Sequence, residues 1–315
     1  MGMPKVVKKC IPVGMRQKIV FQINKFRWQK KQFPKLKSAL WDDSVGYFFR
    51  QFGIGSKFKK LKQFHNKYKG KRCFIIATGP SLTMEDVEML KDEYTFGVNS
   101  IVNVMDKMSY IPTFYAIQDG FAYERLRDKI KAAKLNYTFI ADWKMKKEYL
   151  EDRDWIQYPL TAWDYFTAYP EASFEEKVSF SDDAFKRVYD GFSITYSALQ
   201  LAVYMGFKEI YLLGSDCNYE KGVKNFAEYR DEKHMNACVS NGERMIRAFE
   251  VAAKWAETHD VKIYNATRGG MLEAFERVTL EDVLNSEMGR RISECNQCLV
   301  LLFRCIRHKN IWNGA

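Results

Sequence analysis

Short polar segments follow several apolar runs of this sequence, and they hold the residues best suited to chemistry. The first is Thr78-Gly79-Pro80-Ser81, which comes directly after the apolar run 73–77. Glycine lets the backbone approach a ligand closely, and the free N–H groups that open a following helix bind phosphate. This loop is therefore a candidate phosphate site, with a plain turn as the alternative.

Hydroxyl, amide and carboxyl groups also follow the later apolar runs. The candidates for a ligand site are Asn99, Ser100, Gln118, Asp119, Gly214, Ser215 and Asp216. A second helix entry, Gly191-Phe192-Ser193-Ile194-Thr195, places Ser193 and Thr195 beside another helix N-terminus, where either residue would also serve as an N-cap. The motifs G-x-x-x-x-G-K-[ST] and G-x-G-x-x-G do not occur, which argues against a P-loop NTPase and a conventional dinucleotide fold.

The elements that must position these residues alternate between strands and helices from about residue 68 to 286. Predicted strands are 73–77, Thr95–Val98, Thr113–Ile117, Tyr137–Ala141, Glu209–Leu213 and Val261–Tyr264, and predicted helices are Ser81–Lys91, Thr195–Met205 and Asn236–Thr258. This alternation predicts an α/β, Rossmann-like fold, with a mostly parallel sheet and helices on both faces. In such sheets ligands bind beyond the carboxyl ends of the strands, so the polar segments should share one edge.

The basic charge of the chain is confined to its N-terminal segment. Residues 1–70 hold 18 Lys or Arg against Asp42 and Asp43, although the net charge of the whole chain is only +11. Aromatic residues such as Phe21, Phe26 and Trp28 interleave with these cations. We interpret residues 1–66 as a basic helical extension that binds an anionic membrane surface. A helical appendage packed on the core or on another subunit is the alternative, and nucleic acid is the partner we set aside.

Several other classes of protein are disfavoured. No run reaches the 18 apolar residues of a membrane span, and the N-terminus has no signal-peptide pattern, so we expect a cytoplasmic protein, peripheral on the inner face of the plasma membrane. Seven scattered cysteines fit that compartment. The tail carries four residues spaced like zinc ligands, Cys295, Cys298, Cys305 and His308. The apolar run 299–303 between them favours a helix that carries cysteines over a zinc knuckle.

The runs 73–82, 97–100, 197–216 and 262–267, in this order, resemble one superfamily. It contains bacterial sialyltransferases of the lipooligosaccharide type, motility-associated glycosyltransferases and the archaeal 6-hydroxymethylpterin pyrophosphokinase-like domain. The resemblance covers roughly residues 70–285. It implies a nucleotide-binding α/β transferase domain at 67–288, which leaves an apolar and basic tail at 289–315.

The sialyltransferase branch implies inverting transfer of a sugar from a cytidine monophosphate (CMP) donor without a metal or other cofactor. Its nucleotide loop falls on Thr78, Gly79 and Ser81, its nucleotide-site asparagine on Asn99, and a donor-contacting serine near Ser193 and Thr195. Its general base falls on His234, which follows the segment Gly214-Ser215-Asp216 and precedes the predicted long helix, as the family's base does. A neutral imidazole can accept a proton near pH 7. The tyrosines that would donate hydrogen bonds to the departing phosphate fall on Tyr219 and Tyr229. Gln118 lies near a position that holds an asparagine in the family and so departs from its pattern.

From this resemblance we expect a glycosyltransferase of cell-surface polysaccharide synthesis that uses a nucleotide-linked sugar and a glycan or lipid-linked acceptor. The pyrophosphokinase branch implies adenosine triphosphate (ATP) and Mg²⁺ instead, with carboxylates from Asp119, Asp142 and Asp216. A nucleotide-binding scaffold without activity is the third interpretation. The predicted helix Asn236–Thr258 packs either within the domain or across a subunit interface, so homo-oligomerisation also stays open.

Overall fold

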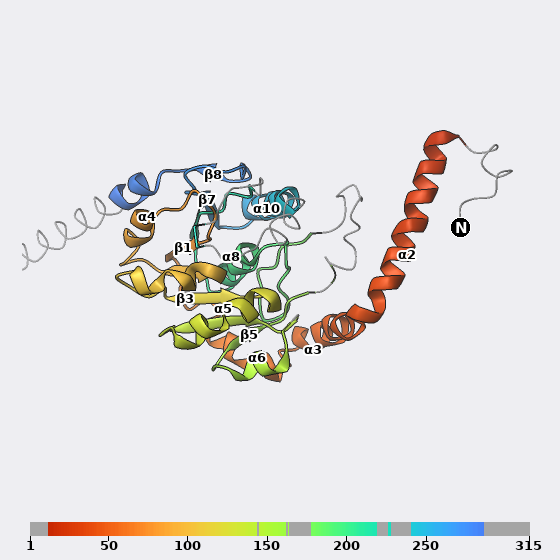
Figure 1. The fold of residues 1–315 in the computed structure, drawn as a ribbon, viewed down its shortest axis with the longest axis horizontal. Coiled ribbons are helices and arrows are strands. Elements are labelled where there is room, and N and C mark those ends of the chain that lie inside the picture. The colour runs from red at the N-terminus through yellow and green to blue at the C-terminus, as the bar shows by residue number, and fades with distance from the viewer. Residues whose placement is uncertain are drawn as a thin grey trace, which may run out of the picture.

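A computed structural model describes residues 12–143, 145–161, 163, 178–218, 226–227 and 241–286. In this part of the chain, eight strands form one sheet in the order β5-β4-β3-β2-β1-β6-β7-β8 (Figure 1). Every neighbouring pair of strands is parallel. The predicted α/β class with a mostly parallel sheet is therefore confirmed.

The strands agree closely with the apolar runs of the sequence. Their bounds are β1 Arg72–Ile76, β2 Thr95–Val98, β3 Phe114–Ile117, β4 Tyr137–Ala141, β5 Ile156–Tyr158, β6 Glu209–Leu213, β7 Lys262–Asn265 and β8 Glu276–Arg277. The sequence analysis missed the edge strands β5 and β8. The first has only three residues, and both residues of the second are exposed and charged, so neither shows an apolar run.

Each face of the sheet has its own apolar cluster, because successive side chains of a strand point to opposite faces. In β1, Cys73 and Ile75 join one cluster, while Phe74 and Ile76 join the other. The first cluster is covered by α8 (Ile194–Tyr204) and α10 (Asn241–Glu257). The second is covered by α4 (Met84–Glu88), α5 (Gly120–Ala132) and the 3-10 helices η3 (Asn99–Asn103) and η4 (Met105–Lys107). Helices therefore cover both faces, as predicted.

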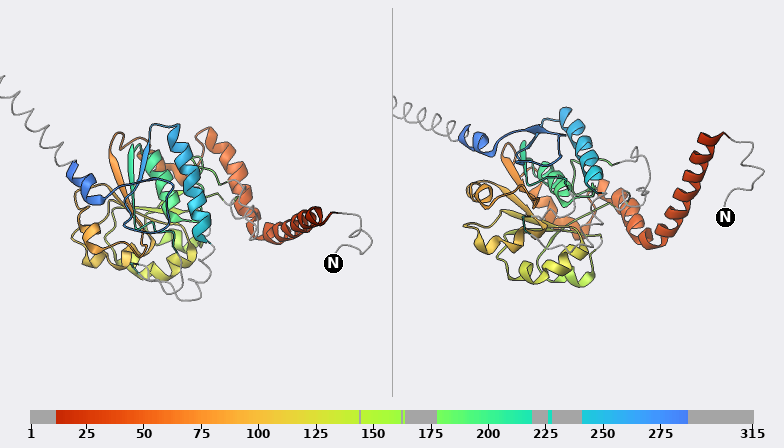
Figure 2. Two further views of the ribbon diagram at one scale, coloured as in Figure 1. Left: turned by 90° about the horizontal axis from the view of Figure 1, so that it is seen from above. Right: turned by 45° about the horizontal axis from the view of Figure 1, so that its top comes forward.

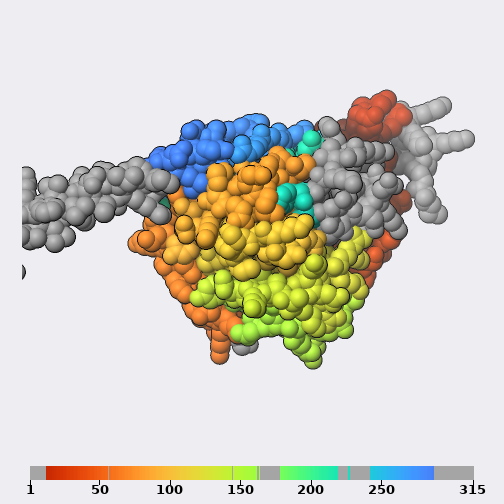
Figure 3. Space-filling view, turned by 60° about the vertical axis from the view of Figure 1, so that its left-hand side comes forward, coloured from red at the N-terminus to blue at the C-terminus, as the bar shows by residue number. Residues whose placement is uncertain are grey.

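Figure 3 shows the side of the molecule formed by the helices that cover the second cluster. There the blue C-terminal segment lies beside the orange segment that contains α4. Side chains join these two segments. The Arg268 guanidinium contacts the Asp86 carboxylate of α4, with Nη2 2.6 Å from Oδ1, and it also contacts Glu281. The loop that follows β7 is thereby held against the start of α4.

The helix predicted at Ser81–Lys91, with Ser81 or Thr83 as its N-cap, is shorter than expected, because α4 begins at Met84 and ends at Glu88. Its N-cap is Thr83, whose hydroxyl accepts a hydrogen bond from the backbone N–H of Asp86, and the Asp86 carboxylate accepts the backbone N–H of Thr83 in return. This capping box uses N–H groups that were expected to bind phosphate. The other two helix predictions agree with α8 and α10, and the predicted residues 236–240 lie outside the described part of the chain.

The N-terminal segment forms a long helix followed by elements that pack on the domain. Helix α2 (Val13–Trp41) projects from the body of the molecule (Figures 1 and 2), and its one buried residue is Leu40. A π-helical turn, η1 (Asp42–Gly46), and α3 (Tyr47–Gln51) lead from α2 to the 3-10 helix η2 (Ser56–Phe64). Within the described residues, no helix has the length and apolarity needed to cross a membrane.

The helix η2 belongs to the core of the domain. A 3-10 helix has three residues per turn, so Phe58, Leu61 and Phe64 lie on one face. All three are at most 1% exposed and belong to the first apolar cluster. The Phe64 ring makes an edge contact with the ring of Phe139 in β4 at a centroid distance of 5.4 Å. The basic segment therefore contributes part of the hydrophobic core.

We predict that two N-terminal truncations will differ sharply in stability. Removing residues 1–66 deletes Phe58, Leu61 and Phe64, each of which contributes about 2–5 kcal/mol when buried, and the domain should not fold. Removing residues 1–36 deletes mainly exposed helix and should change the melting temperature by only a few degrees. Thermal melts followed by circular dichroism test this. If the protein without residues 1–66 unfolded cooperatively at the melting temperature of the full chain, the prediction would be contradicted.

Candidate functional site

The order of the strands places a topological switch point between β1 and β6. From β1 the chain adds strands on one side up to β5, then crosses to the other side of β1 to begin β6. Ligands of such sheets bind where the direction of winding reverses, beyond the carboxyl ends of the strands. The loops at that position are 77–81 after β1 and 214–217 after β6. Together with Asn99, which follows β2, we call them the switch-point site.

The two loops are joined by hydrogen bonds. The Ser81 hydroxyl donates to Asp216 Oδ2 at 2.9 Å, and the Gly79 N–H donates to the Gly214 carbonyl at 2.8 Å. A Cβ at Gly79 would lie 1.9 Å from Asp216 Oδ2 and 2.4 Å from the Gly214 carbonyl oxygen. Only glycine fits this position. Because residues 78–81 are half-buried, the bend keeps some contact with solvent.

Asp216 is a buried carboxylate at the centre of this arrangement. Burial raises the pKa of its carboxyl above the ordinary value of 3.8, although hydrogen bonds from the Ser81 hydroxyl and backbone act in the opposite direction. The loop after β7 packs against it as well, since the Met271 N–H donates to the Asp216 carbonyl at 2.7 Å. The side chain therefore holds the loops together while carrying a charge that burial disfavours.

We predict that Asp216→Asn stabilises the protein at neutral pH. The asparagine oxygen can still accept the Ser81 hydrogen bond, while the buried charge is removed. Because the pKa of Asp216 is raised in the folded protein, its contribution to stability is greatest below pH 3.8 and is lost as the pH rises through the folded pKa. The gain from the variant should therefore disappear toward acid pH in urea-unfolding series.

Asp152→Asn is the matched control, with the opposite sign. The Arg127 guanidinium, with Nε 2.6 Å from Asp152 Oδ2, holds the pKa of this carboxyl well below its ordinary value. Its stabilising effect is present above pH 3.8 and is lost as the pH falls through the folded pKa. The control variant should therefore be less stable than the native protein at pH 7. Equal losses in both variants would refute the argument for Asp216.

Asn99 and Ser100 flank the same loop from the end of β2. The Ser100 hydroxyl donates to Thr78 Oγ1 at 3.1 Å. Asn99 has a φ of +45°, in the left-handed region that asparagine tolerates better than most residues. Its Oδ1 is buried and accepts no hydrogen bond within the described part of the chain. Buried polar atoms are normally paired, so Asn99 has the features of a ligand contact.

Ser215 supplies a second buried polar atom of this kind. Its Oγ has no hydrogen-bond partner among the described residues, while its N–H donates to Thr267 Oγ1 at 3.1 Å. Gly214 precedes it with a φ of +61°, and a Cβ there would lie 3.0 Å from the Ala77 carbonyl oxygen. The two unpaired atoms, Asn99 Oδ1 and Ser215 Oγ, therefore follow the strands on either side of β1.

Two other candidates have structural roles. Gln118 is 5% exposed, its Nε2 donates to Asp190 Oδ1 at 3.1 Å, and its Oε1 lies 3.5 Å from the Tyr158 hydroxyl. Asp119 caps α5 and accepts the Phe121 N–H at 3.0 Å. Both follow β3, two strands away from β1. The amide of Gln118 and one carboxylate oxygen of Asp119 are used within the protein.

The second helix entry also functions as a cap. The Ser193 hydroxyl accepts the Thr195 N–H at 3.2 Å and so begins α8, which is buried along its whole length. Positive φ values at Gly191 and Phe192 make the sharp turn that precedes it. Because α8 precedes β6 and packs on β1, its N-terminus lies at the same edge as the switch-point site. Ser193 and Thr195 therefore lie at the predicted edge of the sheet, and Ser193 also caps α8.

The residues expected to perform the chemistry, His234, Tyr219 and Tyr229, lie outside the described residues, as do Cys295, Cys298, Cys305 and His308. Their roles stay predictions. Sequence reasoning missed Arg277, which donates to the carbonyls of Thr267 and Gly269, each at 3.1 Å, and shapes the loop that packs on Asp216. Nothing in the local pattern around Arg277 signals this role. The side chain reaches the loop only because β8 pairs with β7 in the folded sheet.

Comparisons with known proteins find a family and solved structures that are similar to this chain. The family model described as 6-hydroxymethylpterin diphosphokinase MptE-like matches residues 49–222. The structure of the MAf glycosyltransferase from Magnetospirillum magneticum AMB-1 is 15% identical with a TM-score of 0.43, and the match covers 74% of this chain and 40% of that chain. The structure of the sialyltransferase CST-II in complex with CMP is 14% identical with a TM-score of 0.37, with coverages of 65% and 85%. None of the curated proteins matches the chain.

Proposed function

Because this chain belongs to the family described as 6-hydroxymethylpterin diphosphokinase MptE-like, we propose that it is a transferase with a nucleotide bound at the switch-point site. The family match confirms the superfamily resemblance of the motifs. One observation carries the proposal. Two buried polar atoms without partners in the described residues, Asn99 Oδ1 and Ser215 Oγ, flank the glycine loop that follows β1.

The chemistry of these two atoms supports an orientation for the nucleotide. Asn99 Oδ1 accepts hydrogen bonds, so it suits a ribose hydroxyl or an amino group of the base rather than a phosphate. The hydroxyls of Ser215 and Thr78 can donate to phosphate oxygens. The nucleoside would therefore lie toward β2 and the phosphate toward β6, across the bend at Gly79.

We further propose that the transferred group is a sugar from a CMP-linked donor, passed to a glycan or lipid-linked acceptor. In this reaction His234 would accept the proton of the acceptor hydroxyl, while Tyr219 and Tyr229 would donate hydrogen bonds to the departing phosphate. Phenol hydroxyls can stabilise such a leaving group without a metal ion. No cofactor is then required besides the nucleotide sugar itself.

The placement of the carboxylates favours sugar transfer over a shared magnesium site. Neighbouring strands lie about 4.8 Å apart, so Asp216 after β6 and Asp119 after β3 are separated by roughly 14 Å. Asp142 follows β4, one strand farther away, and it pairs with Lys57 at 2.9 Å. These three carboxylates do not meet. Within the described residues, no group of His, Cys, Asp and Glu is arranged as a metal site.

Diphosphate transfer from ATP is the second candidate, and Asp216 favours it. A carboxylate hydrogen-bonded to the phosphate loop would repel a bound phosphate unless a divalent cation lay between them. The description of the matching family names this activity. Asp216→Asn separates the two candidates, because the variant should bind nucleotide more tightly if no cation is used and lose Mg²⁺-dependent binding if one is.

Thermal shift with defined nucleotides tests the proposed function. We expect CMP without metal to raise the melting temperature, by a stabilisation of about 2.7 kcal/mol at a hundred times its dissociation constant. Assays with CMP-linked sugars should then show release of CMP that is lost in His234→Ala. Stabilisation by ATP only with Mg²⁺ would reject sugar transfer in favour of the kinase, and binding without any turnover would favour the scaffold.

The projecting helix α2 supports a further proposal, that the enzyme works at a membrane surface. The helix carries eight Lys or Arg and no acidic residue, and it exposes large apolar side chains, including Val13, Phe26 and Trp41. Each cation contributes about 1 kcal/mol near an anionic bilayer. The peripheral location at the inner face of the plasma membrane is part of this proposal.

We predict that removing residues 1–36 will strongly reduce binding to vesicles. In flotation assays, the full chain should bind vesicles with 30% phosphatidylserine but not neutral vesicles, and added salt should weaken the binding. The truncated protein keeps Phe58, Leu61 and Phe64 and should stay folded. Undiminished flotation of the truncated protein would reject this role for α2.

A further inference from the structure

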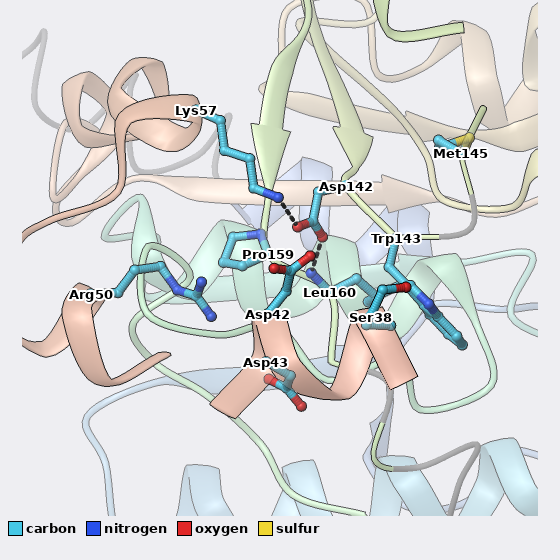
Figure 4. A pocket seen from close by; sticks show the side chains of 11 residues that line it. Ser38, Asp42, Asp43, Arg50, Lys57, Asp142, Trp143, Met145, Pro159 and Leu160 are labelled. Atoms are coloured by element: carbon cyan, nitrogen blue, oxygen red, sulfur yellow. Dashed lines mark hydrogen bonds and ion pairs between the residues drawn. The ribbon is translucent and has the colours of Figure 1, made fainter. Parts of the chain in front are cut away.

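A polar cavity lies at the same edge of the sheet as the switch-point site, beyond the ends of β4 and β5. It has a volume of about 190 Å³ and is lined by Ser38, Ala39, Asp42, Asp43, Arg50, Lys57, Asp142, Trp143, Met145, Pro159 and Leu160 (Figure 4). A cavity of about 150 Å³ admits a benzene-sized molecule, so this one holds a ligand of about one ring. Its walls come from both the N-terminal elements and the strand ends.

Two of its carboxylates are already paired. Asp142 accepts the Leu160 N–H at 3.0 Å and lies 2.9 Å from Lys57 Nζ. Asp43 is 5% exposed, lies 3.0 Å from Arg187 Nε and accepts the Thr161 hydroxyl. These contacts hold η1 and η2 against the loops after β4 and β5. The walls of the cavity are therefore fixed by the fold.

Arg50 lines the cavity with a guanidinium group whose hydrogen-bond donors are only partly used. It is 5% exposed, and its Nε donates to the Lys186 carbonyl at 2.6 Å. Within the described residues, its two terminal nitrogens donate to no acceptor. Figure 4 shows the guanidinium pointing toward Pro159 and Asp42 in the cavity. Burial lowers the pKa of Arg50 from its ordinary value, and Asp142 and Asp43 oppose this shift. A planar pair of N–H donors in such a place suits a carboxylate.

The remaining lining groups suit the hydroxyls and ring of a sugar. Asp42 is exposed in the cavity, and its carboxylate accepts no hydrogen bond within the part of the chain that the structure describes, so its oxygens can accept from hydroxyl groups. The half-buried Trp143 offers an aromatic surface, and Ser38 offers a hydroxyl. Apolar contact combined with a few convergent polar groups is typical of small-molecule sites.

We propose that this cavity binds a carboxylated sugar, with Arg50 on the carboxylate, Asp42 on ring hydroxyls and Trp143 along the ring. A phosphate suits the site less well. Its second negative charge would lie among Asp42, Asp43 and Asp142, against the two lining cations Arg50 and Lys57. The proposal concerns binding only and stands whether or not the protein transfers sugars. Because β4 is three strands from β1, a nucleotide at the switch-point site would leave the cavity open.

Titration calorimetry of the full-length protein with D-glucuronate, D-glucose and acetate tests the proposal. D-Glucuronate should bind with one-to-one stoichiometry and at least about tenfold more tightly than either of the others, because each supplies only half of the recognised groups. Arg50→Lys should weaken D-glucuronate binding about tenfold, since an ammonium group cannot replace the planar pair of donors.

Asp42→Asn is the second variant. Because Asp42 is exposed, this change should leave the fold intact, which thermal melts will verify. It should weaken D-glucuronate binding about threefold or more. Lys60→Gln is the matched control, because Lys60 is an exposed cation of η2 outside the cavity that pairs with Asp154, and it should bind as the native protein does. Absence of saturable D-glucuronate binding, equal binding of D-glucose, or native affinity in both cavity variants would each overturn the proposal.

Discussion

Replacing Gly79 with alanine is expected to reduce nucleotide affinity at least a hundredfold and to destabilise the domain. The new Cβ would lie 2.4 Å from the Gly214 carbonyl oxygen, a backbone atom that cannot rotate away, and 1.9 Å from Asp216 Oδ2. Relieving these overlaps separates the loops after β1 and β6 and breaks the hydrogen bond from Ser81 to Asp216. Overpacking of this kind costs about 1–3 kcal/mol or more. Chemical denaturation and CMP titration measure the two effects.

Gly269→Ala is the matched control for Gly79→Ala. Gly269 lies in the loop after β7, and an added Cβ would meet only Ser81 Cβ, at an ordinary contact distance of 3.9 Å. This variant should keep the native stability within about 1 kcal/mol and bind nucleotide normally. If Gly79→Ala instead binds nucleotide with native affinity, the contact between the two loops does not define the ligand site.

Asn99→Gly should weaken nucleotide binding about tenfold while leaving the stability of the protein nearly unchanged. The loss in affinity follows from removing a buried acceptor that the ligand would satisfy, worth about 1.4 kcal/mol. Stability changes little because glycine adopts a φ of +45° without strain and removes an unpaired polar atom, which offsets its greater freedom in the unfolded chain. Parallel melts and CMP titrations measure both quantities.

Asn66→Gly provides the control for the backbone part of this change. Asn66 also has a positive φ, +56°, but it precedes β1 and its N–H donates to the Tyr204 carbonyl at the C-terminus of α8, at the opposite edge of the sheet. The control should leave CMP affinity unchanged. Equal affinity in Asn99→Gly and the native protein would show that the unpaired Asn99 oxygen does not serve the ligand.

The inner strands could be predicted closely because burial on both faces imposes an uninterrupted apolar run. The predicted bounds of three strands agree with the structure to the residue, namely Thr95–Val98, Tyr137–Ala141 and Glu209–Leu213. Each of these strands has a neighbouring strand on both sides in the sheet. The start of α4 stayed open in the sequence because Ser81 and Thr83 are both good N-caps by type. Only the contact between Thr83 and Asp86 decides between them, and Ser81 is instead drawn to Asp216, 135 residues away.

The candidate site was predicted in part. The polar residues after β1, β2 and β6 could be assigned to one edge because parallel strands end together, and the structure brings Thr78, Ser81, Asn99, Ser215 and Asp216 around a single switch point. The capping role of Asp119 and the buried hydrogen bonds of Gln118 could not be foreseen, because they depend on α5 and Asp190. Arg50 was missed for the same reason, since its charge was counted with the basic N-terminal segment and its contact with the Lys186 carbonyl spans 136 residues.

The packing of residues 40–64 into the core has a consequence for synthesis on the ribosome. Asp43 finds Arg187 across 144 residues, and Arg50 finds the Lys186 carbonyl across 136. At about 5–20 residues per second, translation would take roughly 7–30 s to deliver those partners. During that interval Phe58, Leu61 and Phe64 would have no finished surface to cover them, so this stretch is where a nascent-chain chaperone would bind.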